Sequence, residues 1–476
     1  PFPAPSVTPS PLAFRQFPDP GFFWPALRPE FAADLDGMAE ATRYLLDLRL
    51  DPDSLQLRGQ EWVLYTNRES VALDAIYFRL YPNFPGCRGA ASVTAVQVGE
   101  TLLNPTYEVE RTALRVPLNP LLQPGAAVAL GLRFEVQVPR GDTCRYGDFS
   151  YAGGVMALAH AYPMIPACDD EGWGVELGPA YGDLVHADTS LYQVTMTVPA
   201  GWVVAASGTE VSRSSPEPGL VRMAWVAGPA RDFYMALSPD FLTATEEVGG
   251  VRVTSYFLSD DQAGGGNVLQ VAARALRAYE PLFGPYRYRE LDLVETATLA
   301  GGIEYPGAVV IAGSMYGLEA VYLEEVVAHE VAHQWWYSLV GNDQVDEPWV
   351  DEALATYSSI VYFERALGAA SAEALLEYYW ETYRSTVDAQ RDAPVNRPVG
   401  AYSEGDYYAI VYAKGSLFFD ALRTEIGDEA FWAVLRRYYE RYLYGTATGE
   451  GLLEVAEEVS GRDLHPLYEQ WILSPR

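Results

Sequence analysis

The chain has 476 residues, of which 49% are hydrophobic and 13% aromatic, so a disordered protein is excluded and more than one globular domain is expected. The formal net charge of −32 argues against nucleic-acid binding, which requires a basic surface. No apolar run in the sequence is long enough to cross a membrane. The acidity is interpreted first as a solubility surface and second as an acidic cleft that attracts cationic ligands.

Residues 1–40 open with a proline-rich stretch, "PFPAPSVTPSPLAF", which is typical of a linker or wrapping segment. The chain does not begin with Met, and we expect that an upstream signal or anchor has been removed. This expectation favours an extracytoplasmic, secreted or membrane-anchored protein over a cytoplasmic one. In residues 41–246, segments such as "VALDAIYFRLYP" alternate apolar and polar side chains between turn residues, which predicts an all-β domain.

Helical periodicity replaces this alternation in residues 247–476, after one further strand in "VRVTSYFL". The chain is therefore predicted to belong to the α+β class, with an N-terminal all-β domain followed by a mixed, helix-rich domain. A strand is also expected in "ELDLVETA", and helices are expected over 319–340, 349–367, 371–390, 409–425, 428–443 and 450–458.

The three cysteines, Cys87, Cys144 and Cys168, form no CxxC pair, which argues against a thiolate metal site. Cys87 and Cys144 both stand in turn-like sequence, "FPGCRG" and "GDTCRYG". One disulfide can form among the three, and the odd count leaves its pairing open.

Two histidines, His329 and His333, stand four residues apart in "VVAHEVAHQWWYSLVG". On a helix this spacing places both imidazoles on one face, where they can bind one metal ion. Glu330 lies about 100° further round the helix, so it can flank the ion as a base without binding it. The alternative interpretation is a pair of hydrogen-bonded core histidines on an apolar helix.

A third ligand is available at Glu352. The segment "GNDQVDEP" predicts a turn after the first helix, and Pro348 suits the first turn of the next. Two helices joined by a short loop pack antiparallel, so Glu352 can face the histidines. Asp351 beside it is interpreted as an exposed first-turn carboxylate. Glu325, one turn before His329, is interpreted as a solvated carboxylate in preference to a partner of that imidazole.

Two further motifs accompany the histidines: "GGIEYPG", which begins at Gly301, and "VYAKGSLFF", which contains Tyr412 and the only lysine of the chain, Lys414. Together with the order HExxH, 18 residues, then Glu, they closely resemble the M1 family of zinc aminopeptidases in the gluzincin group. The resemblance extends from about residue 41 to the C-terminus. It implies a saddle-shaped N-terminal β domain and a thermolysin-like catalytic domain.

The resemblance implies one Zn²⁺ per chain, held by His329, His333 and Glu352. It implies hydrolysis of the N-terminal peptide bond by a metal-bound water, with Glu330 as general base and Tyr412 as the donor that stabilises the oxyanion.

Three residues of "GGIEYPG" are interpreted as substrate-binding. Glu304 is expected to pair with the free α-ammonium of a peptide substrate, which makes peptides with a free N-terminus the expected partners. Gly301 and Gly302 are expected to let the substrate backbone approach closely, because they carry no Cβ.

Three features depart from the family pattern. Ile303 and Tyr305 replace the usual Met and Asn, and Tyr305 is expected to narrow the pocket for the first side chain. Residues 145–172 contain no Gln-x-Glu anchor for the amino group, which leaves the acidic run 169–171 as a substitute. The chain stops at Arg476 without the family's large C-terminal helical domain, so a more open site is expected.

Two other functions stay in competition: a thermolysin-like endopeptidase that uses the same zinc and Glu330 on longer peptides, and a non-catalytic peptide-binding scaffold. Blocking the N-terminus of the substrate separates aminopeptidase from endopeptidase. The intact set of ligands, base and tyrosine argues against the scaffold.

Overall fold

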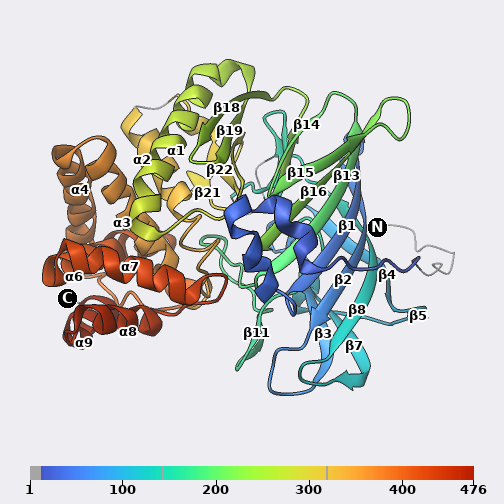
Figure 1. Ribbon diagram of the computed structural model, residues 1–476, viewed down its shortest axis with the longest axis horizontal. Coiled ribbons are helices and arrows are strands. Elements are labelled where there is room, and N and C mark those ends of the chain that lie inside the picture. The colour runs from blue at the N-terminus through green and yellow to red at the C-terminus, as the bar shows by residue number, and fades with distance from the viewer. Residues whose placement is uncertain (1–11, 142–143, 145, 318–319, 476) are drawn as a thin grey trace. The chain divides into compact units, whose positions relative to one another are not determined.

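The computed structural model describes residues 12–141, 144, 146–317 and 320–475 (Figure 1). The chain forms two compact units. The first unit comprises Pro1–Leu177, Ala187–Val204 and Gly208–Pro239, and the second comprises Gly178–His186, Ala205–Ser207 and Asp240–Arg476.

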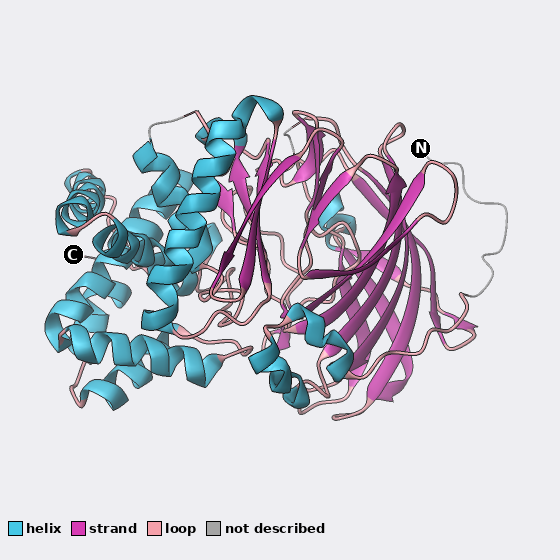
Figure 2. Cartoon of the chain, turned by 45° about the horizontal axis from the view of Figure 1, so that its top comes forward, coloured by secondary structure: helices cyan, strands magenta, loops and turns pink. Residues whose placement is uncertain are grey.

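The first unit is built around an eight-stranded sheet with the order β15-β16-β13-β1-β2-β8-β4-β5 (Figures 1 and 2). Strand β1 pairs in parallel with β13 and antiparallel with β2. The strands are β1 (Thr42–Asp51), β2 (Gln56–Thr66), β4 (Ala90–Val98), β5 (Thr101–Leu102), β8 (Ala127–Gln137), β13 (Ser190–Pro199), β15 (Thr209–Ser214) and β16 (Leu220–Ala230).

Three smaller sheets accompany it, with the orders β3-β7-β6, β14-β17-β10-β9 and β11-β12. Their strands are β3 (Leu73–Arg79), β6 (Thr106–Glu108), β7 (Ala113–Leu122), β9 (Phe149–Ala152), β10 (Val155–Leu158), β11 (Cys168–Asp169), β12 (Gly172–Trp173), β14 (Val203–Ala206) and β17 (Met235–Ser238).

The segment 1–40 lies partly outside the described residues, since these begin at residue 12. It contains two 3₁₀ helices, η1 (Pro20–Ala26) and η2 (Pro29–Gly37). Leu12 is buried with Leu45 and Trp62, and the Gln97 side chain accepts from the Leu12 N–H at 2.6 Å and donates to its carbonyl at 2.9 Å. This part of the segment therefore covers the large sheet.

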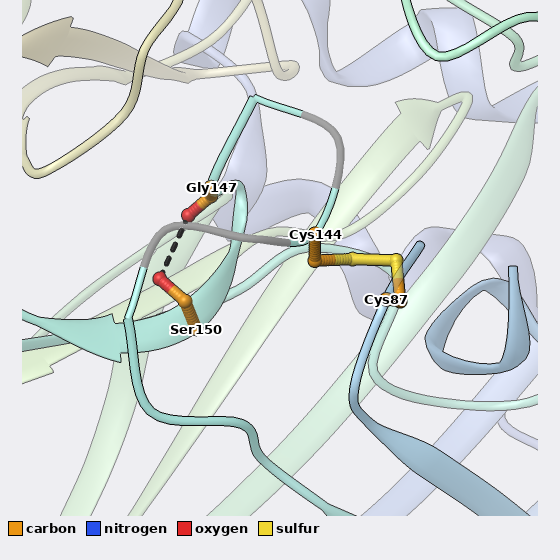
Figure 3. Close-up of a disulfide and its surroundings, with 4 residues drawn as sticks. All are labelled: Cys87, Cys144, Gly147 and Ser150. Carbon is orange, nitrogen blue, oxygen red and sulfur yellow. Dashed lines mark hydrogen bonds between the residues drawn. A yellow bond between two sulfur atoms is a disulfide. The ribbon is translucent and has the colours of Figure 1, made fainter. Parts of the chain in front are cut away.

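The cysteine pairing that the sequence left open is Cys87–Cys144, shown in Figure 3 beside the hydrogen bond from Ser150 Oγ to the Gly147 carbonyl. Cys168 is a half-buried free thiol. Burial, together with the neighbouring Glu69 carboxylate, raises the pKa of Cys168 to about 12. A thiol with such a pKa is a poor metal ligand at neutral pH, in keeping with the absence of a CxxC motif.

The second unit combines a five-stranded sheet, ordered β18-β19-β20-β22-β21, with helices, so the predicted α+β class is confirmed (Figure 2). Among the helices of the described residues, none has the length and apolarity to span a bilayer. The elements are β18 (Leu242–Val248), β19 (Val251–Phe257), β20 (Glu290–Thr296), β21 (Gly302–Ile303), β22 (Ala308–Ala312), α1 (Gln262–Phe283), α2 (Ala320–Ala332), α3 (Trp349–Ala366), α4 (Ala369–Asp388), α5 (Glu404–Tyr407), α6 (Gly415–Ile426), α7 (Asp428–Tyr442), α8 (Gly449–Ser460) and α9 (His465–Tyr468).

The helix predicted over 319–340 is shorter than expected, because α2 ends at Ala332. The His333 N–H still bonds to the His329 carbonyl at 3.3 Å, so both histidines belong to the last helical turn. Tyr337 has a φ of 125°, which a right-handed helix does not accommodate. The apolar residues after Ala332 are buried in an irregular turn, and their apolarity alone did not distinguish this turn from a helix.

The helix predicted over 409–425 is also divided, into a π-helical segment η8 (Tyr408–Lys414) and α6. The Gly415 N–H reaches back five residues to the Ile410 carbonyl. The wider turn leaves the rings of Tyr408 and Tyr412 stacked, with centroids 5.3 Å apart. Such π-helical turns occur often at functional sites, and this one carries a predicted catalytic residue.

Lys414 is fully buried at the end of η8. Its Nζ donates to Asp392 Oδ1 at 3.0 Å and to the backbone carbonyls of Ala393 and Ser474 at 2.7 and 2.8 Å. An ammonium group offers three donors, so this lysine ties η8 to the 392–393 loop and to the segment near the C-terminus.

Replacement of Lys414 by Met is expected to lower the free energy of unfolding by about 3–5 kcal/mol, because it leaves the buried Asp392 without its cation. The control is Arg384→Met, which removes the exposed ion pair with Glu377 and is expected to cost less than about 1 kcal/mol. Urea unfolding of both variants measures the difference, and equal losses would refute the structural role of Lys414.

Candidate metal centre

The three predicted ligands meet at one point between α2 and α3. The Nε2 atoms of His329 and His333 are 3.1 Å apart, and they lie 3.2 and 3.3 Å from Glu352 Oε2. All three side chains are buried. The sequence spacing thus brings two imidazole nitrogens and one carboxylate oxygen together, facing one another.

Hydrogen bonds set the orientation of both imidazoles. His333 Nδ1 lies 2.8 Å from the Trp336 carbonyl, which can only accept, so Nδ1 carries a proton and Nε2 is the ring nitrogen that faces His329 and Glu352. His329 Nδ1 lies 3.5 Å from Thr356 Oγ1, a residue on α3 that the sequence did not single out. Outer contacts of this kind fix metal-binding histidines in position.

The chemistry of these groups fits a zinc ion. Two imidazoles and one carboxylate form the protein ligand set of a catalytic zinc site, and they leave one coordination position open. Burial acts to raise the pKa of Glu352, but His333 and His329 beside it lower this pKa below its usual range. The carboxylate is therefore kept anionic, as a metal ligand must be.

Two more carboxylates, Glu304 and Glu330, surround His333, and ligand atoms of all three residues lie within 4.8 Å of one another. Burial raises the pKa of Glu330 well above its usual value, and the nearby Glu304 and Glu352 add to this effect, whereas His333 opposes it. Burial also raises the pKa of Glu304. A carboxylate with a raised pKa can both take and return a proton near neutral pH.

Gly302 is a glycine for a different reason from the expected one. A Cβ at this position would lie 2.3 Å from Glu330 Cγ and 2.5 Å from Glu330 Oε1. The space is filled by the side chain of Glu330, not left for a substrate. At Gly301 the nearest atom to a Cβ would be Val326 Cγ2, at an ordinary 3.4 Å.

The sequence interpretation missed Gln344. Its Nε2 donates to Glu304 Oε1 at 2.8 Å and to Asp351 Oδ2 at 2.9 Å. Asn342 donates to Asp351 Oδ1 at 2.8 Å. The signal was the pair of amides in "GNDQVDEP", which was interpreted only as turn chemistry.

The prediction that Asp351 is an exposed first-turn carboxylate is wrong. Its side chain is buried, with 1% of the residue exposed, because the 341–348 loop covers it. Burial, with the neighbouring Glu352, raises the pKa of Asp351 to about 7. Two amide donors meet this carboxylate, so its role is to hold the loop that positions Glu304.

The loop that carries Glu304 is fastened to the residues directly after α2. The Gly307 N–H donates to Gln334 Oε1 at 2.8 Å, and Gln334 Nε2 donates to the Tyr305 carbonyl at 3.2 Å. Tyr305 is itself buried. Gln334 follows His333 directly, so the same turn of chain fixes a predicted metal ligand and the loop of Glu304.

Tyr412 lies against the predicted metal ligands. Its hydroxyl donates to Glu352 Oε1 at 2.7 Å, and its ring stacks on His329 with centroids 5.8 Å apart. Glu325 was interpreted as a solvated carboxylate, but it is half-buried and accepts from Tyr379 OH at 2.6 Å.

Comparison with known proteins finds a peptidase family, aminopeptidases and zinc metallopeptidases. The family described as "Peptidase family M1 domain" matches residues 268–471. Aminopeptidase N of Lactococcus lactis subsp. cremoris is 32% identical over 168 residues, which cover 32% of this chain and 19% of that protein. Aminopeptidase N of Streptomyces lividans is 24% identical over 311 residues, 59% of this chain and 35% of that protein. The match thus spans about a third or less of these curated relatives.

Solved structures match over nearly the whole chain. An M1 zinc metallopeptidase from Deinococcus radiodurans has a TM-score of 0.68 at 20% sequence identity, covering 91% of this chain and 95% of that one. A two-domain M1 zinc metallopeptidase with bound L-arginine has a TM-score of 0.70 at 19% identity, covering 92% and 94%. At this identity the likeness establishes the fold of both units. The resemblance inferred from the motifs is thereby confirmed over residues 268–471, which match the peptidase family M1 domain.

Proposed function

We propose that the chain is a zinc-dependent aminopeptidase that hydrolyses the N-terminal peptide bond of peptides. One observation carries this proposal: the predicted ligands, a buried base and a further buried carboxylate form one cluster around His333. The matches to proteins called aminopeptidase N and leucyl aminopeptidase support the same activity.

His329, His333 and Glu352 are the residues that hold the metal, one ion per chain. When bound, a zinc ion supplies Lewis-acid catalysis and makes a water molecule nucleophilic near neutral pH. The protein fixes the ligands through Trp336, Thr356 and Tyr412, so they need little rearrangement.

Glu330 is the proposed general base. It takes the proton of the attacking water and returns it to the nitrogen of the leaving amine. Its burial and raised pKa suit it to both steps. Tyr412 is the proposed oxyanion donor: its hydroxyl, which donates to Glu352 in this structure, can turn to the developing negative charge.

Glu304 is the proposed anchor for the substrate's free α-ammonium group. It is buried, and Gln344 holds one of its oxygens at 2.8 Å, so its position next to Glu330 is fixed. A charge-assisted contact at this place sets the first peptide bond of the substrate beside the base. Peptides with a free N-terminus are therefore the proposed substrates.

Aminoacyl substrates with a fluorogenic leaving group are expected to be cleaved only when their amino group is free. Glu304→Gln is expected to lower kcat/KM for these free substrates about 10–100-fold, since it removes a hydrogen bond to a charged group. A chelator is expected to abolish cleavage, and zinc is expected to restore it. If Glu304→Gln cleaves free and N-acetylated substrates as the unaltered protein does, the exopeptidase assignment fails and an endopeptidase remains.

We further propose an oxidising compartment as the location of the protein. The support is the Cys87–Cys144 disulfide, because such bonds persist mainly outside the reducing cytosol.

A further inference from the structure

A cavity of about 550 Å³ lies on the second unit and is bordered by α2, α3, α4 and η8. Its walls are largely apolar, formed by Val321, Phe363, Leu367 and Leu375. Val321 and Leu367 are 47% and 44% exposed, although both are aliphatic. A concave apolar surface of this volume is the usual form of a site for a small ligand or a side chain.

Stacked rings link the wall of the cavity to the predicted metal ligands. Tyr408 lines the cavity and stacks on Tyr412 at 5.3 Å, and Tyr412 stacks on the metal ligand His329 at 5.8 Å. Glu325, also in the wall, precedes His329 by one turn, or about 6 Å along α2. An extended peptide advances about 3.3 Å per residue, so two residues bridge this distance.

The proposed amino-group anchor and the stacked rings that lead to the cavity lie beside different predicted metal ligands. Glu304 lies next to His333, whereas Tyr408 and Tyr412 lead away from His329. A peptide held at Glu304 by its N-terminus and cleaved at the metal therefore directs its leaving part towards the cavity.

Glu324 and Glu325 both line the cavity, but among the described residues only one of them is paired with a cation. Glu324 pairs with Arg274 at 2.7 Å and accepts from Tyr362 OH at 3.3 Å. Glu325 accepts from Tyr379 OH at 2.6 Å, and no cation among the residues that the structure describes is paired with it. The apolar cavity thus contains one half-buried carboxylate without a counter-ion.

We propose that this cavity receives an arginine or lysine side chain from the leaving part of the substrate, one or two residues after the cleaved bond. This inference rests on the proposed aminopeptidase function. The methylene groups lie against the aliphatic wall, and the cationic end pairs with Glu325. An apolar side chain would remove water from Glu325 without providing a partner, which is unfavourable.

Two features support a cation in particular. The rings of Tyr378 and Tyr408 line the cavity and are 48% and 39% exposed, so they can stack against a guanidinium or ammonium group. The chain carries a net charge of −32, which draws basic peptides towards it in solution.

The test uses peptides of equal length with the same first residue, in which the second or the third residue is Arg, Lys, norleucine or Glu. The zinc-loaded protein is expected to prefer Arg and Lys to norleucine about tenfold in kcat/KM at one of these positions, and Glu is expected to be the poorest. Glu325→Gln is expected to reduce this preference to less than about twofold. Glu324→Gln, the matched control, is expected to retain it, because Arg274 already neutralises Glu324.

Binding of the same peptides is measured on zinc-loaded Glu330→Gln protein, and their affinities are expected to follow the same order as kcat/KM. In the double variant that also carries Glu325→Gln, the preference for Arg and Lys is expected to disappear. Equal affinity for Lys and norleucine, or a preference that persists without Glu325, would overturn the inference. Cleavage of all peptides without preference would contradict the proposed role of the cavity and leave the aminopeptidase proposal standing. A complete failure of cleavage contradicts the aminopeptidase proposal, and the Kd values then still decide what the cavity binds.

Discussion

Replacement of Glu330 by Gln is expected to lower kcat by about 10²–10⁴-fold, the range for loss of a general base. Glutamine has nearly the same shape as glutamate, so the space beside Gly302 stays filled and the fold is retained. The substitution removes the group that takes the proton of the attacking water, and it leaves His329, His333 and Glu352 in place. Zinc content, measured by atomic spectroscopy, is therefore expected to equal that of the unaltered protein.

Glu373→Gln is a suitable control, since it makes the same chemical change at an exposed position on α4. It is expected to leave kcat unchanged. A Glu330→Gln protein that binds zinc and still turns over at the full rate would refute the assignment of the base. Loss of zinc along with activity would instead show that Glu330 supports the ligands.

Replacement of Gly302 by Ala is expected to reduce kcat about 100-fold or more, because a Cβ would lie 2.3 Å from Glu330 Cγ. Glu330 is buried among Glu304, Glu352 and His333, so its side chain cannot move aside without losing its position relative to the substrate. A displacement of about 1 Å can cost two orders of magnitude in rate. KM is expected to change less than kcat.

The neighbouring glycine provides the control for this experiment. At Gly301 an added Cβ meets Val326 at 3.4 Å, which is an ordinary contact, so Gly301→Ala is expected to retain most of the activity. Steady-state kinetics on one free aminoacyl substrate compares the two variants. Equal effects at both positions would mean that substrate approach, and not the fit of Glu330, requires the glycines.

The convergence of the ligands could be predicted from the sequence because it follows from local rules. The spacing of His329 and His333 sets a common helical face, and a short connection before Pro348 returns the chain so that Glu352 meets them. The alternating pattern of the first half likewise predicts strands without reference to distant residues.

Features that depend on distant segments could not be predicted in this way. Asp351 has the sequence context of an exposed cap, and only the covering loop with Asn342 and Gln344 buries it. The sequence around Gly302 is typical of a turn. Only the packing of α2 shows that the Glu330 side chain occupies the space that a Cβ at residue 302 would need. The end of α2 is similar, because tryptophans suit a helix and a buried turn equally well.

The buried position of Lys414 also decides how the protein can be modified. This lysine is the only side-chain amine in the 476 residues, and its Nζ is enclosed by Asp392 and two carbonyl groups. Amine-directed reagents need an accessible, uncharged amine, so the folded chain offers them no lysine. Cross-linking, immobilisation or labelling of the folded chain through side chains therefore has to use groups other than amines, such as its many carboxylates.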